Sequence, residues 1–188
     1  MIETTHSFHC LRKTEFGLVA VLWSIHQKQP KIWRILLSQP TVSAKQIVRR
    51  SFPDSMPYSC TEIDLVADRI AAFIKGEYIR FSLAIARLDL CSPFQQKVLR
   101  AEHGIPRGRV STYRRIATHL HNANGARAVG TALATNPFPI IIPCHRAIRS
   151  DGTLGGYQGG LEMKRALLEK EGILFDSSGR VVTEELYY

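Results

Sequence analysis

The sequence changes character at the segment Ser92-Pro93-Phe94-Gln95, and this change limits the chain to a two-part fold. Ser92 is a favoured N-cap residue, Pro93 suits the first position of a helix, and Gln95 completes a capping box. Before this segment, apolar and polar residues alternate in stretches of strand length, whereas after it short apolar stretches are separated by Gly, Pro and Asn. We therefore expect an α+β protein in which a small α/β domain with an antiparallel sheet precedes a mainly helical domain. The expected divisions are residues 1–90, residues 91–174 and a tail of residues 175–188.

The first domain is predicted to contain three strands connected as an antiparallel meander. The stretches concerned are rich in Val, Ile, Leu, Trp and Phe, and they cover residues 6–11, 18–26 and 32–37. A capping box that begins at Ser43 predicts a short helix to Arg50. Thr61 is expected to cap a longer helix that ends at Gly76. Residues 52–60 are expected to form a loop, and residues 79–85 a last strand.

The second domain is predicted to contain a helix-turn-helix. Helices are expected over residues 93–103, 113–120, 126–135 and 161–170. The second and third of these are short and joined by a brief polar turn, which is a helix-turn-helix arrangement and makes the domain winged-helix-like. The run Ile140-Ile141-Ile142 is expected to be a buried strand. The composition of the tail is compatible with a hairpin and with a loose segment.

Positive charge is concentrated in the second domain. The chain carries 25 Lys and Arg against 16 Asp and Glu, and twelve of the basic but only five of the acidic residues lie between Pro93 and Leu174. This asymmetry favours a nucleic-acid partner, although a solvated basic face explains the charge equally well. Apolar runs fall short of a membrane-spanning helix, and the N-terminus lacks the pattern of a secretory signal. A soluble protein without a membrane partner is therefore expected.

Four cysteines are present, and none has the Cys-x-x-Cys spacing of a zinc or redox site. Cys60 and Cys91 are expected to be small buried hydrophobic residues. His6 and His9 near Cys10 give a weak metal signal, but strand alternation places His9 and Cys10 on opposite faces. No metal site is therefore predicted.

Cys144 differs from the other cysteines in its surroundings. It follows an apolar run and a proline and precedes His145, and a nearby imidazole or cation favours the thiolate that a nucleophile requires. Further motifs accompany it in order along the chain: Phe94-Gln95-Gln96-Lys97-Val98, Gly108-Arg109-Val110-Ser111-Thr112-Tyr113, Arg127-Ala128-Val129-Gly130, Asn136-Pro137, Pro143-Cys144-His145-Arg146 and Gly156-Tyr157-Gln158-Gly159-Gly160-Leu161. In order and spacing, these motifs resemble the O6-alkylguanine-DNA alkyltransferases, or methylated-DNA–protein-cysteine methyltransferases.

The resemblance implies direct DNA repair at Cys144. This thiol would take the alkyl group from O6 of guanine, with O4 of thymine as a second target, and keep it as a thioether. Each molecule would act once, without a cofactor. Glu171 would orient His145, and His145 would act on the thiol through a water, in the manner of a catalytic triad. Asn136 would hold the turn around the active site by hydrogen bonds.

The resemblance also implies contacts with duplex DNA, from which the target base is flipped out. Arg127 matches the family's finger, which fills the gap left by the base, and Tyr113 matches the tyrosine that helps rotate the nucleotide. The other residues expected at the DNA are Ser111, Thr112, Ala126 and Arg146. The base and alkyl pocket is expected to be lined by Pro139, Ala147, Tyr157 and Gln158. Gln158 replaces the small residue expected in this family. The resemblance therefore does not fix the size of the alkyl group that the pocket accepts.

Three other functions compete with this one. An alkyltransferase-like protein would bind damaged DNA without transfer, but such proteins replace the acceptor cysteine that this chain keeps. A helix-turn-helix regulator would have no need of the pair His145 and Glu171. A cysteine hydrolase would turn over many times, whereas an alkyltransferase stops after one equivalent. The expected partner is double-stranded DNA containing alkylated guanine, bound by a monomer in the cytoplasm, at the nucleoid in a prokaryote or in the nucleus in a eukaryote.

Overall fold

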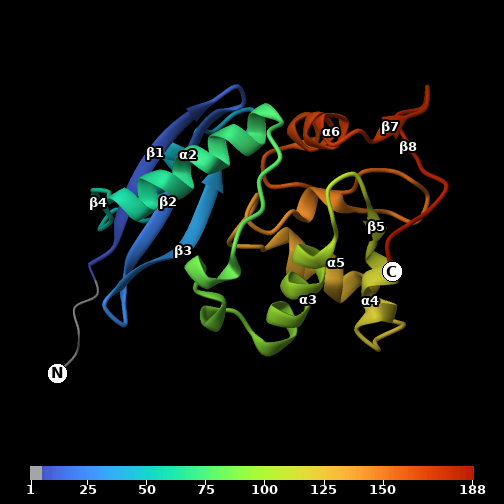
Figure 1. Cartoon of the computed structure of the whole chain (residues 1–188), viewed down its shortest axis with the longest axis horizontal. Coiled ribbons are helices and arrows are strands. Elements are labelled where there is room, and N and C mark those ends of the chain that lie inside the picture. The colour runs from blue at the N-terminus through green and yellow to red at the C-terminus, as the bar shows by residue number, and fades with distance from the viewer. Residues whose placement is uncertain (1–5) are drawn as a thin grey trace. The chain divides into compact units, whose positions relative to one another are not determined.

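The computed structural model describes residues 6–188, and these residues form two compact units (Figure 1). The N-terminal unit comprises the described residues up to Leu90 together with Pro137–Ile141. The C-terminal unit comprises Cys91–Asn136 and Ile142–Tyr188. The short segment 137–141 thus departs from the linear division that we expected.

The N-terminal unit contains a four-stranded sheet with the order β3-β2-β1-β4. Its antiparallel part consists of β1 (Phe8–Thr14), β2 (Gly17–His26) and β3 (Gln29–Leu37). Gln27 and Lys28 both have positive φ between β2 and β3, as a tight two-residue hairpin turn requires. The predicted meander of three strands is confirmed.

Two sequence expectations next to the sheet are wrong. Within the predicted loop, β4 (Met56–Pro57) pairs in parallel with β1. Instead of a strand, the segment 79–85 ends in a 3₁₀ turn at Leu83–Ile85. The turn forms because the Ser82 side chain accepts a hydrogen bond from the backbone amide of Ala84, which bends the chain away from an extended path.

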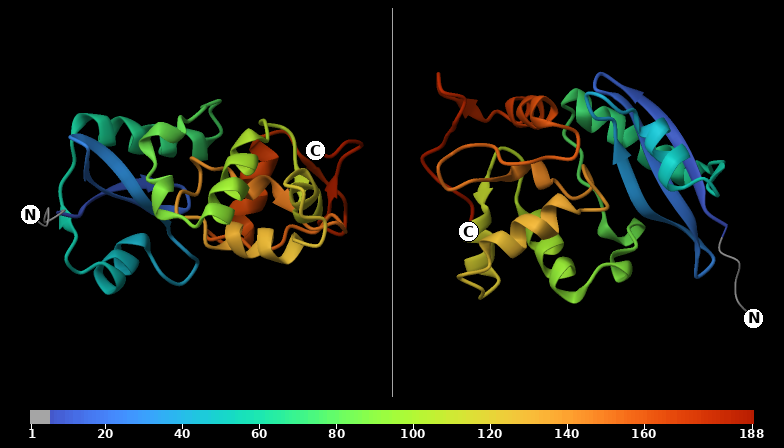
Figure 2. Two further views of the ribbon diagram at one scale, coloured as in Figure 1. Left: turned by 90° about the horizontal axis from the view of Figure 1, so that it is seen from below. Right: turned by 180° about the vertical axis from the view of Figure 1, so that it is seen from behind.

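Helices α1 (Ala44–Ser51) and α2 (Thr61–Lys75) cover opposite faces of this sheet (Figure 2). The capping box of Ser43 and Gln46 is present, and Gly76 ends α2 in the left-handed region as predicted. Cys60, not Thr61, occupies the N-cap position of α2. Because the sheet is covered on both sides, β2 is buried at every position from Val19 to Ser24, which hides the alternation expected of a half-exposed strand.

The C-terminal unit contains four helices that confirm the predicted segments. They are α3 (Pro93–Gly104), α4 (Tyr113–His119), α5 (Ala126–Ala134) and α6 (Leu161–Lys170). Helices α4 and α5 form the helix-turn-helix, and α3 packs against both. Ser92 caps α3, but Gln95 does not complete a capping box, because its Nε2 donates to the backbone carbonyl of Ala132 at 3.1 Å. Gln95 thereby ties α3 to the end of α5.

The run Ile140-Ile141-Ile142 is buried but is not a strand. Pro139 and Pro143 flank it and offer no amide hydrogen for pairing, and Ile140 has a φ of 75°, which reverses the chain. Immediately afterwards, Cys144–Arg146 forms a 3₁₀ turn. This turn leads into β6 (Ala147–Ile148), which pairs in parallel with β5 (Ser111–Thr112).

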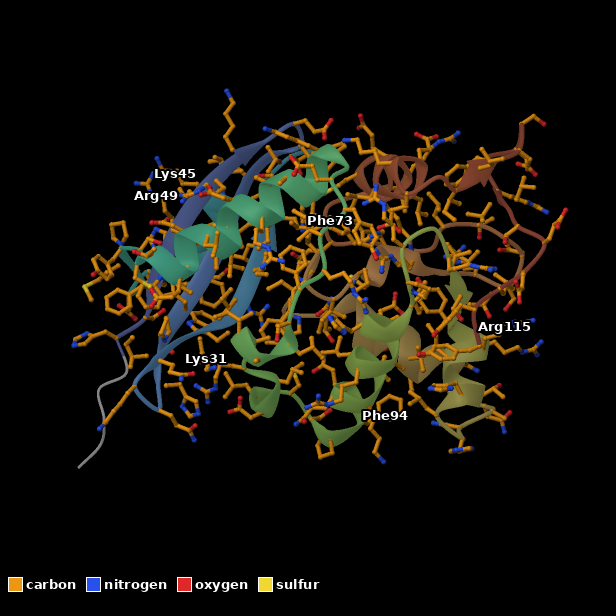
Figure 3. The ribbon with its side chains drawn as sticks, viewed as in Figure 1. Lys31, Lys45, Arg49, Phe73, Phe94 and Arg115 are labelled. Atoms are coloured by element: carbon orange, nitrogen blue, oxygen red, sulfur yellow. The ribbon has the colours of Figure 1, made fainter. Side chains whose placement is uncertain are left out.

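The tail forms a hairpin and then lies against the C-terminal unit. Strand β7 (Leu174–Phe175) pairs antiparallel with β8 (Val181–Val182). Arg115, which projects from α4 in Figure 3, donates to the backbone carbonyls of Leu186 and Tyr188. The Tyr188 hydroxyl donates to the Ala101 carbonyl at 2.8 Å. The structure therefore decides between the two alternatives in favour of an ordered tail.

Neither a membrane span nor a metal site is found within residues 6–188. No helix of this part is long and apolar enough to cross a membrane. No group of three His, Cys, Asp or Glu side chains gathers there as metal ligands. The Nδ1 atom of His9 lies 3.1 Å from the Ser55 hydroxyl, while Cys10 is buried.

Ile70 tests how strongly α2 depends on its sheet-facing side. Ile70 is fully buried, whereas Leu65 on the same helix is 59% exposed. Ile70→Ala should lower the free energy of unfolding by about 2–5 kcal/mol because it leaves a cavity. Leu65→Ala should change it by about 0.5 kcal/mol or less. Urea unfolding measures both, and equal losses would contradict this packing.

Candidate active site

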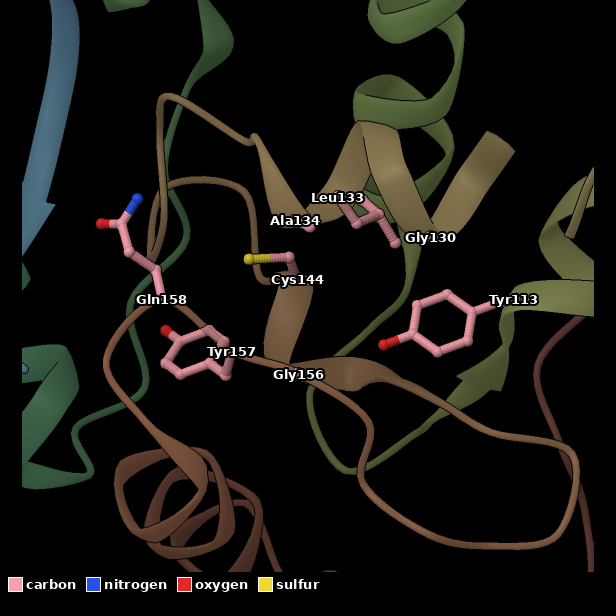
Figure 4. Close-up of a pocket in the computed structure, with 8 residues that line it drawn as sticks. All are labelled: Tyr113, Gly130, Leu133, Ala134, Cys144, Gly156, Tyr157 and Gln158. Carbon is pink, nitrogen blue, oxygen red and sulfur yellow. The ribbon is translucent and has the colours of Figure 1, made fainter. Parts of the chain in front are cut away.

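Cys144 lies on the wall of a cavity of about 200 Å³ in the C-terminal unit (Figure 4). The thiol follows Pro143 and opens the 3₁₀ turn, and the residue is only 7% exposed. The other lining residues are Tyr113, Gly130, Leu133, Ala134, Gly156, Tyr157 and Gln158. They come from α4, α5 and the loop before α6, so three segments distant in sequence meet at the sulfur.

The thiol of Cys144 is protonated at rest. Burial raises the pKa of Cys144 to about 11, and a hydrogen bond from Asn136 together with the charge of Lys164 opposes this only in part. The Asn136 Nδ2 atom lies 3.3 Å from Sγ and 3.2 Å from the Ile142 carbonyl oxygen. Asn136 therefore connects the end of α5 with the Cys144 turn and donates toward the sulfur, where it would stabilise a thiolate.

His145, the residue after Cys144, forms a buried pair with Glu171. The His145 Nε2 atom lies 3.0 Å from Glu171 Oε1. Burial lowers the pKa of His145, and the hydrogen bond to Glu171 only partly restores it. The imidazole is therefore neutral at pH 7, and Nε2–H donates to the carboxylate. In this tautomer Nδ1 carries no proton and has the capacity to accept one.

Arg146 holds Glu171 in the ionised state. Its Nε donates to Oε2 at 2.8 Å and its Nη2 to Oε1 at 2.7 Å, in a bidentate arrangement. Burial alone would raise the pKa of Glu171, but the hydrogen bonds from His145 and Arg146 outweigh it and hold the pKa at about 2. The Arg146 Nη1 atom donates to the Ile105 carbonyl at 2.6 Å. The expectation that Arg146 contacts DNA is thus wrong for this structure, because its guanidinium is buried and occupied.

A second and more open cavity of about 500 Å³ adjoins the first. It is lined by Tyr113, Arg114, Ala126, Arg127, Gly130, Thr131, Ala134, Arg149 and Ser150. Tyr113, Gly130 and Ala134 line both cavities, so they form a shared wall. Arg114 and Arg127 of the helix-turn-helix and Arg149 after β6 thus line one groove beside the buried thiol. Three of the predicted DNA residues, Tyr113, Ala126 and Arg127, line this groove.

Ser111 and Thr112 do not face the groove. Ser111 is buried, and its hydroxyl donates to the backbone carbonyl of Tyr187 at 2.7 Å. Thr112 is buried as the N-cap of α4, where its hydroxyl accepts from the Arg115 amide. The tail covers Ser111 and the α4 cap occupies Thr112, so neither hydroxyl is positioned for a phosphate. That expectation is corrected.

The predicted pocket residues divide into two groups. Tyr157 and Gln158 line the cavity beside Cys144 (Figure 4). Ala147 is fully buried within β6 and lies outside the lining set. Pro139 is buried in the segment 137–141, which belongs to the N-terminal unit.

Two buried charged residues were missed by the sequence predictions. Lys164 on α6 is fully buried, and its Nζ donates to the Ala147 and Leu154 carbonyls. Burial lowers the pKa of Lys164 to about 8. Glu102 on α3 is also fully buried, and burial raises the pKa of its carboxyl to about 8. Helical spacing offered a signal, because each residue falls on the apolar face of its helix.

Comparisons with known proteins identify a family for the part of the chain that contains Cys144. Residues 93–173 match the family described as "6-O-methylguanine DNA methyltransferase, DNA binding domain". The chain is 42% identical over 126 residues to the methylated-DNA–protein-cysteine methyltransferase of Methanothermobacter thermautotrophicus, an alignment that covers 67% of this chain and 69% of the relative.

Solved structures extend the likeness beyond the matched region. The crystal structure of Mycobacterium tuberculosis O6-methylguanine methyltransferase is similar with a TM-score of 0.68 and 30% identity, covering 88% of this chain and 92% of that one. A structure of the Mycobacterium tuberculosis protein in complex with DNA gives a TM-score of 0.67 at 30% identity, with 87% and 92% covered. In sequence and in fold, the chain belongs to the methylated-DNA–protein-cysteine methyltransferase family.

Proposed function

We propose that Cys144 repairs alkylated DNA by taking the alkyl group from O6 of guanine onto its own sulfur. In this reaction the S–C bond forms as the C–O6 bond breaks, and guanine leaves with its own oxygen. The observation that carries the proposal is the buried Cys144 on a cavity wall, with the Asn136 amide 3.3 Å from its sulfur and a buried His145–Glu171 pair that begins at the next residue. A thioether is not readily reversed, so each molecule acts once.

The ionisation states of the site indicate how protons would move during the transfer. A thiol with a pKa of about 11 needs a base, and neutral His145 takes its proton through a bridging water. The ionised Glu171 stabilises the resulting imidazolium. Burial raises the pKa of Tyr113 to about 12, so its hydroxyl keeps its proton and is available to hydrogen-bond the ring edge of the base. Guanine leaves as an anion and takes up one proton from the site, which balances the proton that the thiol has lost.

The open groove is proposed to receive duplex DNA. Arg114, Arg127 and Arg149 line it and supply positive charge for phosphates. The target base rotates out of the duplex, passes the residues that line both cavities and enters the Cys144 cavity. Arg127 on α5 fills the gap that the base leaves in the duplex. O4 of alkylated thymine presents the same kind of carbon and is the second substrate of this proposal. One chain supplies all the cavity-lining residues, so a monomer suffices.

Transfer should appear as a change in the mass of the protein. Incubation with duplex DNA containing O6-methylguanine should add one methyl group per molecule, located on Cys144 by peptide mass spectrometry, and then stop. Cys144→Ser should abolish the transfer because the serine hydroxyl is a far weaker nucleophile.

Cys60→Ser provides the matched control. Cys60 occupies the N-cap of α2, a position that favours serine, so this variant should fold and transfer normally. An unchanged mass together with tight binding of the lesion would instead support a damage-binding protein without transfer. Continued release of product beyond one equivalent would support a hydrolase.

Arg127→Ala should slow repair of duplex DNA by about tenfold or more, since it removes a contact worth roughly 1–3 kcal/mol. The same variant should react almost normally with the free base O6-methylguanine, which needs no flipping. Single-turnover rates on both substrates make the comparison. Arg49→Ala, which removes a charge from α1, is the control and should leave both rates nearly unchanged. An equal loss on both substrates would remove the flipping role of Arg127.

A further inference from the structure

The hydroxyl of Tyr157 is a buried polar group that the proposed transfer does not use. Among the described residues, this oxygen is buried and has no hydrogen-bond partner. Buried tyrosine hydroxyls are almost always paired, because leaving one unpaired costs free energy. Tyr157 also lines the cavity that contains Cys144, so a ligand in this cavity can supply the missing partner.

The surroundings fix this hydroxyl as a hydrogen-bond donor. The Tyr157 ring stands edge-on to His145, with centroids 6.2 Å apart and an interplanar angle of 83°. Burial, with smaller contributions from Cys144 and Glu171, raises the pKa of Tyr157 well above its ordinary value, so the phenol stays protonated. In Figure 4 the Tyr157 hydroxyl and the sulfur of Cys144 both lie on the side of the lining residues away from Tyr113.

The wall of the cavity also has open space at the residue before Tyr157. A Cβ added at Gly156 would meet nothing within 4 Å, and this glycine is not in the left-handed region. Gly155 is different: its φ is +68°, and a Cβ there would lie 2.7 Å from the Tyr113 hydroxyl. Gly155 is thus needed for the close approach of Tyr113, whereas Gly156 leaves open space in the wall of the cavity.

We propose that this cavity selects O6 substituents that carry an acceptor oxygen beyond the transferred carbon, with the 2-hydroxyethyl group as the simplest case. The Tyr157 hydroxyl donates to that oxygen while Cys144 attacks the carbon bonded to O6. The S–C bond forms, the C–O6 bond breaks, and the substituent's own hydroxyl is unchanged. This inference rests on the proposed transfer and adds a substrate class to it.

An isosteric pair of substrates isolates the hydrogen bond. O6-(2-hydroxyethyl)guanine and O6-propylguanine have substituents of nearly equal size, but only the first offers an oxygen to Tyr157. A neutral hydrogen bond of ordinary strength corresponds to roughly a fivefold change in rate. The ratio of the hydroxyethyl rate to the propyl rate should therefore be roughly fivefold higher in the wild type than in Tyr157→Phe. Comparing ratios cancels both the intrinsic reactivity of the two substrates and any general loss in the variant.

Two further variants serve as controls. Gly156→Ala should slow both substrates in the same proportion, because it narrows the cavity without touching a polar group. Gln158→Ala tests the neighbouring polar side chain, and it should preserve the ratio if Tyr157 is the donor. Rates are measured under single-turnover conditions on duplex DNA, with the adduct located on Cys144 by mass spectrometry.

Each outcome supports or overturns the inference. A ratio unchanged by Tyr157→Phe overturns it, and this includes the case in which the hydroxyl holds only the relay water and both rates fall together. The inference is also overturned if the ratio of the hydroxyethyl rate to the propyl rate falls in Gln158→Ala but not in Tyr157→Phe. If Tyr157→Phe does not fold, the wild-type ratio is compared with that of a simple thiol in solution, and an equal ratio overturns the inference. Absence of any adduct on Cys144 would instead overturn the proposed transfer itself.

Discussion

The buried arginine–carboxylate pair of Arg146 and Glu171 is the interaction on which the site depends. A carboxylate removed from water is stable only with close, well-directed partners, and losing one partner of such a pair costs about 3–5 kcal/mol. Arg146 meets this need with two hydrogen bonds to Glu171 and a third to the Ile105 carbonyl. The pair therefore joins the Cys144 turn, the end of α6 and the segment after α3, and the position of His145 follows from it.

This arrangement keeps the thiol buried and protonated until its proton can be accepted. An exposed thiolate reacts with many electrophiles and oxidants, whereas a buried thiol with a raised pKa is inert. Cys144 is of the second kind, and burial is the main cause. The Asn136 amide donates toward the sulfur and would stabilise the thiolate, while the neutral imidazole of His145 is the proposed acceptor of the proton, so the thiol ionises only when it can pass its proton on. For a protein proposed to act once, such protection preserves the reactive group until a substrate is bound.

The sequence predicted the elements whose signals are local. The meander of β1 to β3, the capping box at Ser43 and the helix that ends at Gly76 each depend on residues a few positions apart. The failures have tertiary or backbone causes. Ile140-Ile141-Ile142 has the composition of a buried strand, but the prolines on either side of it lack the amide hydrogens that strand pairing requires. The sequence does not reveal that Arg146 is buried against Glu171 and thus unavailable to DNA. Glu102 belongs to no motif, and its one signal is its place on the apolar face of α3.

The residues of the shared wall connect the groove proposed to bind DNA with the cavity in which transfer is proposed. Gly130 and Ala134 are small and lie one helical turn apart on α5, so the wall is thin on the side that faces the arginine-lined groove. Tyr113 is the large member of the wall, and Gly155 approaches its hydroxyl closely. In the proposed reaction, a base that enters from the groove passes these two small residues and meets the Tyr113 hydroxyl before it reaches the sulfur. Helix α5 carries both Arg127, which lines the groove, and the small residues of the shared wall, so the proposed recognition of the duplex and the proposed access to Cys144 depend on the same helix.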